Sequence, residues 1–331
     1  MKAVIYKGLR DVSLVDMDTP SPGEGEVLLR THACGLCHTD IAILNGQYGN
    51  STFPLIPGHE YAGVIAEIGR GVVNFVPGDR VVVDPNLSCG HCRQCQRHRP
   101  NLCETLGAYG VTRHGGFAAF SIVREHNILP IGEMSFERAA LAEPMGCVLN
   151  GLKTIGLDNI FKVLIFGGGP IGLLFAFALQ SLGINDVVIA DINVKRLALV
   201  ESLGFHATFS RRDELVRFKE DMDLVIETTG VPDVAASSLD YLMKGGKSLY
   251  FGICPQDSLI KISPFDVFRR QLKIAGSHSL PHNIKEALDV IKNIGSSIDA
   301  LVSHRLEISE IPGILSTHPP SEALKIQAVW N

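Results

Sequence analysis

Four cysteines gather in one short segment of the 331-residue chain, and their types and spacing are suited to metal chemistry. Three of them follow one another with two residues between each pair, and the fourth comes after seven more. Four thiolates complete a tetrahedral zinc site and leave no position open for a substrate. We therefore expect a structural zinc ion held by Cys89, Cys92, Cys95 and Cys103.

This cysteine segment also permits other interpretations. An iron–sulfur cluster matches the first three cysteines, but the fourth is too distant for ferredoxin spacing, and four thiols without a metal are a further alternative. Arg93, Arg97 and Arg99 between the cysteines would suit a zinc module that grips nucleic acid. Since the chain has 30 basic and 35 acidic residues, a net charge of −5, and shows no recognition helix, we expect no nucleic-acid partner.

A second group of potential metal ligands is scattered along the chain: Cys37, the adjacent pair His59 and Glu60, and Glu143. Mixed thiolate, imidazole and carboxylate donors with room for water are those that a catalytic zinc ion uses. Their spacing along the sequence does not show that these residues meet in the fold. Taken singly, Cys37 is more often a small buried hydrophobic residue and His59 an ordinary loop histidine.

A glycine-rich turn at residues 167–172 fits G-x-G-x-x-G, follows an apolar strand pattern and opens a helix pattern. Gly167 suits the tight turn, Gly169 lets the backbone approach a pyrophosphate, and Gly172 allows close helix packing. Asp191 ends the next strand pattern, where a carboxylate accepts hydrogen bonds from ribose hydroxyls and repels a 2′-phosphate. The pattern predicts NAD rather than NADP, although Arg196 on the following helix could serve a phosphate.

The elements that must position these residues fall into two patterns. Residues 2–124 carry short strand patterns separated by Pro and Gly turns, whereas strand and helix patterns alternate after Pro144, as in a parallel sheet flanked by helices. The uncharged run 163–179 could be taken for a membrane span, but glycines and a proline interrupt it, so we expect no membrane contact. The tail from residue 301 returns to strand and turn patterns.

Composition is consistent with a compact protein of about two domains, since 46% of residues are hydrophobic and 20% are charged. The first fourteen residues lack the apolar core of a signal peptide. We therefore expect a cytoplasmic protein, whose eight cysteines are thiols or metal ligands rather than disulfides.

On the basis of these motifs, the whole chain resembles the zinc-containing medium-chain alcohol and polyol dehydrogenases. Five features follow one another in the family's order: the Cys37 segment, Gly58-His59-Glu60, the four-cysteine segment, Glu143-Pro144, and the glycine turn with Asp191. The resemblance implies an α/β plus β fold, in which a GroES-like catalytic domain is split around a Rossmann NAD-binding domain with the active site in the cleft between them. It also implies homodimers or homotetramers.

The resemblance implies domain limits and residue roles. The catalytic domain is expected at 1–150 and 295–331, and the Rossmann domain at 151–294. Cys37, His59 and Glu143 resemble the family's catalytic zinc ligands, and Glu60 resembles either an exchanging ligand or a supporting carboxylate. Asp40 matches the residue that orients the histidine, and Thr39 matches the hydroxyl that receives the substrate proton. The implied NAD contacts are Gly167, Gly169, Pro170, Ile171, Gly172, Asp191, Arg196, Gly252, Ile253, Ser277 and His278.

The expected reaction is hydride transfer from a secondary alcohol, a polyol or sugar alcohol, to NAD, because a glutamate at position 143 goes with the sorbitol and threonine branches of the family. The segment 276–280 lacks the Arg-Tyr pair of mammalian sorbitol dehydrogenases, and residues 40–43 lack the histidine frequent in threonine dehydrogenases. Threonine, a simple alcohol and a sugar-alcohol phosphate stay open as alternative substrates. A zinc- and nucleotide-binding protein without catalysis is the alternative from another functional class.

Overall fold

The computed structural model describes residues 1–48, 51–317, 319–320 and 322–330. The chain divides into two compact units, and the first combines residues 1–146 with residues 280–331. The second unit comprises residues 147–279. The division after residue 146 falls within helix α3 (Ala142–Ile155), so this helix begins in the first unit and ends in the second.

The first unit is built mainly of strands, as the short strand patterns predict. Its largest sheet runs in the order β16-β17-β3-β4-β5-β9, with β8 also paired to β3. Strands β1 (Lys2–Gly8) and β2 (Asp11–Asp16) form a separate hairpin, and β6 (Asn86–Leu87) pairs with β7 (Gly107–Ala108). The strands of the large sheet are β3 (Glu26–Gly35), β4 (Glu60–Ile68), β5 (Arg80–Val83), β8 (Phe120–Arg124), β9 (Ile128–Pro130), β16 (Val302–Leu306) and β17 (Lys325–Val329).

Strand β17 shows that the tail returns to the first unit, as expected. It pairs antiparallel with β3 and parallel with β16, and Ile326 and Ala328 bury their side chains in the same core as Val27 and Leu29 of β3. The helices of this unit are α1 (His38–Leu44), α2 (Phe136–Ala139), α9 (Ile284–Ile294) and α10 (Ile311–Thr317).

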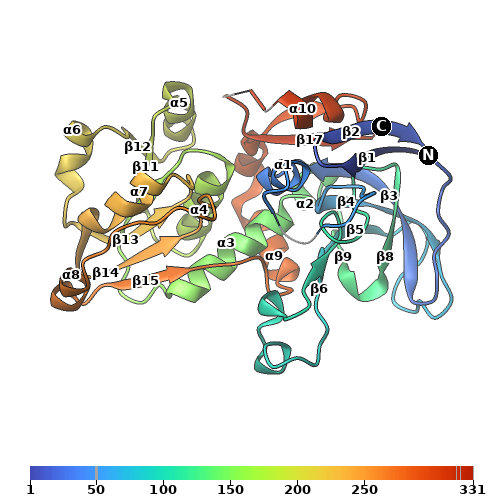
Figure 1. The fold of residues 1–331 in the computed structure, drawn as a ribbon, viewed down its shortest axis with the longest axis horizontal. Helices are drawn as coiled ribbons and strands as arrows, with labels where there is room; N and C mark the ends of the chain where they lie inside the picture. The colour runs from blue at the N-terminus through green and yellow to red at the C-terminus, as the bar shows by residue number, and fades with distance from the viewer. Residues whose placement is uncertain (49–50, 318, 321, 331) are drawn as a thin grey trace. The chain divides into compact units, whose positions relative to one another are not determined.

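The second unit has the parallel sheet that the alternating pattern predicts, in the order β12-β11-β10-β13-β14-β15 (Figure 1). Helix α4 packs on β10 and β11, α5 on β11 and β12, and α8 on β14. The strands are β10 (Lys162–Phe166), β11 (Asp186–Asp191), β12 (His206–Phe209), β13 (Met222–Glu227), β14 (Leu242–Tyr250) and β15 (Lys273–Gly276). The helices are α4 (Pro170–Ser181), α5 (Val194–Ser202), α6 (Arg212–Leu215), α7 (Pro232–Ser237) and α8 (Pro264–Arg270).

The uncharged run 163–179 divides into β10 and α4, as its glycines predict. Pro170 occupies the first turn of α4, where its missing N–H removes no helical hydrogen bond. The helix is apolar on all sides, and Leu173 to Leu179 are buried in the unit's interior. No helix in the described ranges has both the length and the apolar character that crossing a membrane requires.

The fold class agrees with the expectation, but the unit boundaries differ from the expected domain limits. Helix α9 and residues 280–283 before it belong to the first unit, whereas the Rossmann domain was expected to run to residue 294. The reason is visible in the loop: Asn86 Nδ2 of β6 donates to the Leu280 carbonyl at 2.7 Å, and Asn283 Nδ2 donates to the Gly146 carbonyl at 3.0 Å. Helix periodicity alone does not reveal such partners.

Candidate active site and metal centres

The four cysteines of residues 89–103 lie together in the first unit. Their sulfur atoms are all within 4.8 Å of one another, with Cys89 and Cys95 4.0 Å apart and Cys92 and Cys103 3.9 Å apart. Sulfurs at the corners of a tetrahedron around zinc, each ~2.3 Å from the ion, are about 3.8 Å apart. The cluster therefore fits the predicted structural zinc site.

Electrostatics also favour a cation in this cysteine cluster. Hydrogen bonds from the backbone of Cys95 and Glu104 lower the pKa of Cys92 to about 6, whereas burial and the neighbouring Cys92 raise the pKa of Cys95 to about 12. Backbone N–H groups of Cys89 and Cys92 donate to sulfur atoms at 3.3 Å, as expected around thiolates. Closely spaced thiols do not all ionise without a cation, and zinc supplies the compensating charge.

A second cluster in the same unit brings together Cys37, His59 and Glu60, whose potential ligand atoms lie within 4.8 Å of one another. Cys37 stands at the N-cap of α1, and His59 and Glu60 are buried where β4 begins. Thr39 lies half-buried in the first turn of α1. A thiolate, an imidazole and a carboxylate at this separation are the mixed donor set of a catalytic zinc site.

Asp40 joins the segments that carry this second cluster. It is fully buried, and its carboxylate accepts hydrogen bonds from the backbone N–H of Cys37 at 2.9 Å and of Gly58 at 3.1 Å. One carboxylate oxygen also lies 3.5 Å from His59 Nδ1. Burial disfavours the charged form of His59, but the charges of Asp40 and Cys37 outweigh burial and raise its pKa well above the usual value.

Two buried polar atoms in this second cluster have no hydrogen-bond partner among the described residues, namely His59 Nδ1 and Glu60 Oε2. The other carboxylate oxygen, Glu60 Oε1, accepts a hydrogen bond from Lys325 Nζ at 2.7 Å. Orphaned buried donors and acceptors are costly, and a metal ion removes that cost at Oε2. The residues present therefore fit a metal ion.

Glu143 lies outside this cluster, although the family resemblance gives it a ligand's role. It is buried in the first turn of α3, and its charge contributes to raising the pKa of Lys325. Lys325 itself was missed by the sequence reasoning. It is buried at the start of β17, and although burial lowers its pKa, the carboxylate of Glu60 outweighs this and raises it. The available signal was a lysine at the start of a strand pattern in which Ile326, Ala328 and Val329 are apolar.

The glycine-rich turn lies at the carboxyl end of β10 in the second unit. Gly167 has a positive φ of 107°, which favours glycine. A Cβ built on Gly172 would lie 1.9 Å from the Gly167 carbonyl oxygen, so the helix starts too close to the turn for any side chain. A Cβ on Gly169 would meet no atom nearer than 4.0 Å. Its surroundings are therefore open, as a pyrophosphate cradle requires.

Asp191 ends the neighbouring strand β11, and its carboxylate fixes the turn. Oδ2 accepts a hydrogen bond from Gly168 N and Oδ1 accepts one from Asn193 N, both at 2.7 Å. Arg196 Nη1 lies 3.7 Å from Oδ2. An ionised carboxylate accepts about four hydrogen bonds, so acceptor capacity remains for the hydroxyls of a ribose.

The remaining expected NAD contacts follow strands β14 and β15 of the same sheet, whose carboxyl ends share an edge with the glycine turn. Gly252 N donates to the Glu227 carbonyl at 2.8 Å, and the next residue, Ile253, is exposed. Asn150 Nδ2 donates to Ser277 Oγ and to the His278 carbonyl, both at 3.2 Å. Asn150 and Glu227 hold these loops and were not anticipated from the sequence.

Known proteins are similar to this chain in both of its units. Residues 23–133 match the model of the alcohol dehydrogenase GroES-like domain, and residues 170–293 match that of the zinc-binding dehydrogenases. The chain is 47% identical over 308 residues to D-altritol 5-dehydrogenase of Agrobacterium fabrum, covering 92% of each chain. It is 33% identical to D-arabinitol dehydrogenase 1 of Uromyces fabae, covering 100% of this chain and 97% of the relative.

A solved structure agrees with these relatives. A protein of Sinorhizobium meliloti, described as a zinc-binding dehydrogenase and solved with NADP, superposes with a TM-score of 0.94 and 32% identity, covering 99% of both chains. The two family models together account for more than half of the sequence. The chain therefore belongs to the family of zinc-containing medium-chain alcohol and polyol dehydrogenases.

Proposed function

We propose that this chain oxidises a polyol or sugar alcohol at a secondary hydroxyl, with zinc at the Cys37–His59–Glu60 cluster and NAD at the glycine turn of the second unit. The observation that carries the proposal is the second cluster itself, which brings three donor types within 4.8 Å of one another and includes the unpartnered carboxylate oxygen Glu60 Oε2. The 47% identity to a polyol dehydrogenase supports the substrate class.

The residues of the cluster are proposed either to bind the metal or to hold its ligands in place. When bound, zinc supplies Lewis acidity that lowers the pKa of an alcohol hydroxyl toward neutrality. Cys37 and His59 donate the thiolate and the imidazole, and Asp40 holds both of their backbone segments. Lys325 holds Glu60 Oε1, and Oε2 has no hydrogen-bond partner among the described residues. Glu60, whose carboxylate lies within 4.8 Å of the ligand atoms of Cys37 and His59, is therefore proposed as a metal ligand, and Glu143, to which the family resemblance gives that role, is the alternative.

Proton and cofactor handling are assigned to separate residues. Thr39, two residues after Cys37, is proposed to accept the proton of the substrate hydroxyl. Bound NAD would supply the acceptor for the hydride. Asp191 is proposed to accept hydrogen bonds from the adenosine ribose, and its negative charge disfavours the 2′-phosphate of NADP. The Sinorhizobium meliloti relative was solved with NADP, so NADP is tested beside NAD.

The test is cofactor reduction by purified, zinc-loaded protein with D-altritol, D-arabinitol, other hexitols and pentitols, sugar-alcohol phosphates, threonine and primary alcohols. Turnover concentrated on free polyols with NAD supports the proposal. Turnover of threonine alone contradicts the polyol assignment and favours the second candidate, because relatives 32–35% identical over 77% of this chain are threonine 3-dehydrogenases. NAD binding without turnover of any alcohol favours the non-catalytic alternative.

We further infer a homodimer or homotetramer in a reducing cytoplasm. Phe265 and Phe268 of α8 are 70% and 80% exposed, and Leu259 is 94% exposed, which is unusual for large apolar side chains that have no partner surface. The cysteine cluster requires reduced thiols. Light scattering of the purified protein tests the assembly, and cell fractionation tests the compartment.

A further inference from the structure

A pocket of about 490 Å³ in the first unit lies beside the cysteine cluster. Cys89 lines it, but none of Cys37, His59 and Glu60 does. The volume is within the range of small-molecule sites, roughly 300–1,000 Å³. The pocket is therefore distinct in its lining from the proposed catalytic cluster, and the reaction proposed above makes no use of it.

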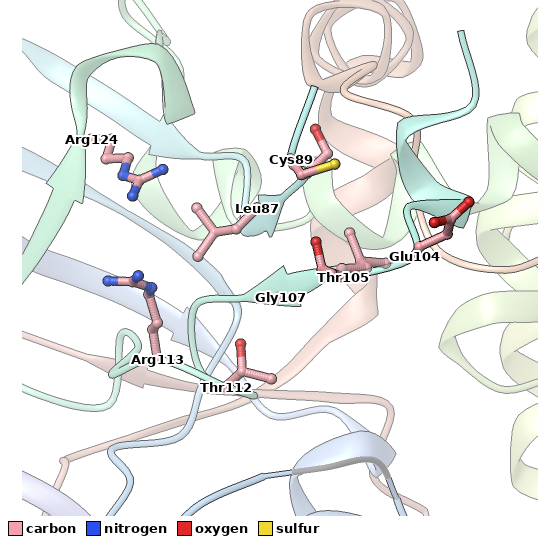
Figure 2. A pocket seen from close by; sticks show the side chains of 10 residues that line it. Leu87, Cys89, Glu104, Thr105, Gly107, Thr112, Arg113 and Arg124 are labelled. Atoms are coloured by element: carbon pink, nitrogen blue, oxygen red, sulfur yellow. The ribbon is translucent and has the colours of Figure 1, made fainter. Parts of the chain in front are cut away.

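Two arginines of this pocket have no partner for their charge within the described residues. Arg113 is exposed and Arg124 is half-buried, and no ion pair or side-chain hydrogen bond of either guanidinium group is present there. Some other arginines of this unit do have partners: Arg80 donates to the Gly132 and Met134 carbonyls, and Arg138 donates to both oxygens of Asp299. Figure 2 shows Arg113 and Arg124 on one side of the pocket and Glu104, the one carboxylate of its described lining, on the opposite side.

Glu26 does not neutralise Arg124, although it lies directly opposite in the pairing of β3 with β8. Its carboxylate turns back to accept a hydrogen bond from Gly23 N at 3.1 Å. The side of the pocket that carries the two guanidinium groups is therefore positively charged. Guanidinium groups match the oxygens of phosphates through paired hydrogen bonds.

One hydroxyl group of the pocket lining is already hydrogen-bonded to a histidine. Ser88 lines it, and Ser88 Oγ lies 3.0 Å from His282 Nε2, while His282 Nδ1 lies 2.9 Å from Asp84 Oδ2. The hydrogen bond with buried Asp84, together with its charge, outweighs burial and raises the pKa of His282. The hydroxyl of Ser88 is therefore held in place by the His282 ring.

Ser88, His282 and Asp84 have the order of a hydrolytic triad. However, the backbone N–H of Cys89, next to Ser88, donates to Cys103 Sγ and not toward an oxyanion position. We propose that this pocket binds a phosphate monoester or inorganic phosphate, held by Arg113 and Arg124. A dianionic phosphate matches two cationic groups, whereas a monocarboxylate leaves one guanidinium without its charge partner.

The experiment is calorimetric titration of the zinc-loaded full chain with inorganic phosphate, glycerol phosphate, malonate and acetate at constant ionic strength. The protein is first saturated with NADH, so that the glycine turn is occupied and does not bind phosphate. Arg113→Gln and Arg124→Gln are each expected to weaken phosphate binding about tenfold, because each removes a charge-assisted hydrogen bond. The double variant is expected to lose saturable binding.

Arg97→Gln is the matched control, since Arg97 is an exposed arginine of the same cysteine segment that does not line the pocket. It removes the same charge and should leave phosphate affinity unchanged. Zinc content and circular dichroism show whether each variant keeps its fold. The proposal is overturned by an absence of saturable phosphate binding in the unaltered protein, by equal weakening in the control, or by malonate binding as tightly as phosphate.

Discussion

At the scale of single residues, the buried carboxylate of Asp40 explains how two distant ligand segments meet. It accepts hydrogen bonds from the backbone N–H of Cys37, the N-cap of α1, and of Gly58 before β4. These bonds fix the positions of the two segments that carry Cys37 and His59. Both oxygens are used, which satisfies the buried charge. Gly58 has a positive φ of 91°, and a Cβ there would approach Cys34 Sγ to 2.6 Å, so the close approach also requires glycine.

Replacing the proposed thiolate ligand tests the catalytic metal site. Cys37→Ser should bind one zinc ion per chain instead of two, and turnover should fall about a thousandfold, since Lewis-acid stabilisation of the transition state is worth several kcal/mol. Because Cys37 is only half-buried, far-ultraviolet circular dichroism should not change. Zinc is measured by atomic absorption, with Cys254→Ser as a control that keeps both ions. Two zinc ions and normal turnover in Cys37→Ser contradict the assignment.

The glycine turn permits a sharper comparison between two residues. Gly169→Ala places a methyl group in open space where the pyrophosphate is expected, so NAD binding should weaken tenfold or more at a cost of about 1–3 kcal/mol. Its φ of −79° suits alanine, so stability should stay equal or rise by about 0.4–1 kcal/mol. Titration of NADH fluorescence and urea unfolding measure the two effects.

Gly172→Ala is the matched comparison for Gly169→Ala, because its methyl group would collide with the Gly167 carbonyl. It should lower the free energy of unfolding by about 1–3 kcal/mol before any effect on NAD is considered. If Gly169→Ala destabilised the protein as much as Gly172→Ala did, or bound NAD normally, the open cradle at Gly169 would not be the cofactor site.

At the scale of elements, the loop between β15 and α9 is held by side chains rather than by its own backbone pattern. Ser279 and His282 have positive φ values of 54° and 58°, which residues other than glycine rarely adopt. Asn86 donates to the carbonyl of Leu280, and His282 pairs with Asp84 at 2.9 Å. These contacts keep residues 280–283 in the first unit.

The pair formed by His282 and Asp84 predicts a pH dependence of stability. The hydrogen bond and charge of Asp84 raise the pKa of His282 above its unfolded value, despite burial, and the ring also faces Ser88 and His126. A raised folded pKa stabilises the protein fully below the unfolded pKa of about 6.5, and this contribution is lost as the pH rises through the folded pKa.

His282→Asn removes the titrating ring while keeping a residue that tolerates positive φ. The loss in free energy of unfolding should be larger at about pH 6 than at about pH 9. Urea unfolding of both proteins at the two pH values measures it, with His206→Asn, which replaces an exposed histidine of the second unit, as the control. An equal loss at both pH values shows that the ring acts by packing and not by charge.

At the scale of the whole molecule, the two proposed ligand classes belong to different units. Within the described residues, both clusters suited to a metal lie in the first unit, and the glycine turn with Asp191 lies in the second. A ligand that binds only folded protein stabilises it in proportion to RT ln(1 + [L]/Kd), about 2.7 kcal/mol at a hundred times Kd. Zinc and NAD should therefore stabilise different parts of the chain.

Differential scanning calorimetry tests this separation. After chelation of zinc, thermal unfolding is expected to show two transitions, of which the lower belongs to the first unit and the higher rises with NAD. Restoring zinc should raise only the lower transition. Hydrogen exchange in residues 89–103 and 167–172 identifies which unit each transition reports. One transition that zinc and NAD shift equally would show that the units unfold together.

The sequence by itself determined the features that depend on neighbours along the chain. The four-cysteine segment, the glycine turn with Asp191 and the division of residues 163–179 into strand and helix were all predicted, because their ligands or hydrogen-bond partners lie within one or two elements. The spacing of residues along the sequence is therefore enough to predict these features. Periodicity likewise indicated the parallel sheet of the second unit.

Only the tertiary structure decided which carboxylate joins Cys37 and His59, and that a buried lysine holds it. Lys325 reaches Glu60 because β17 returns to pair with β3, which brings together residues 265 positions apart. The same is true of Asn86 and Leu280, whose contact places α9 in the first unit. Such contacts depend on strand register and on the burial of charge across the fold, and no short stretch of sequence records either of them.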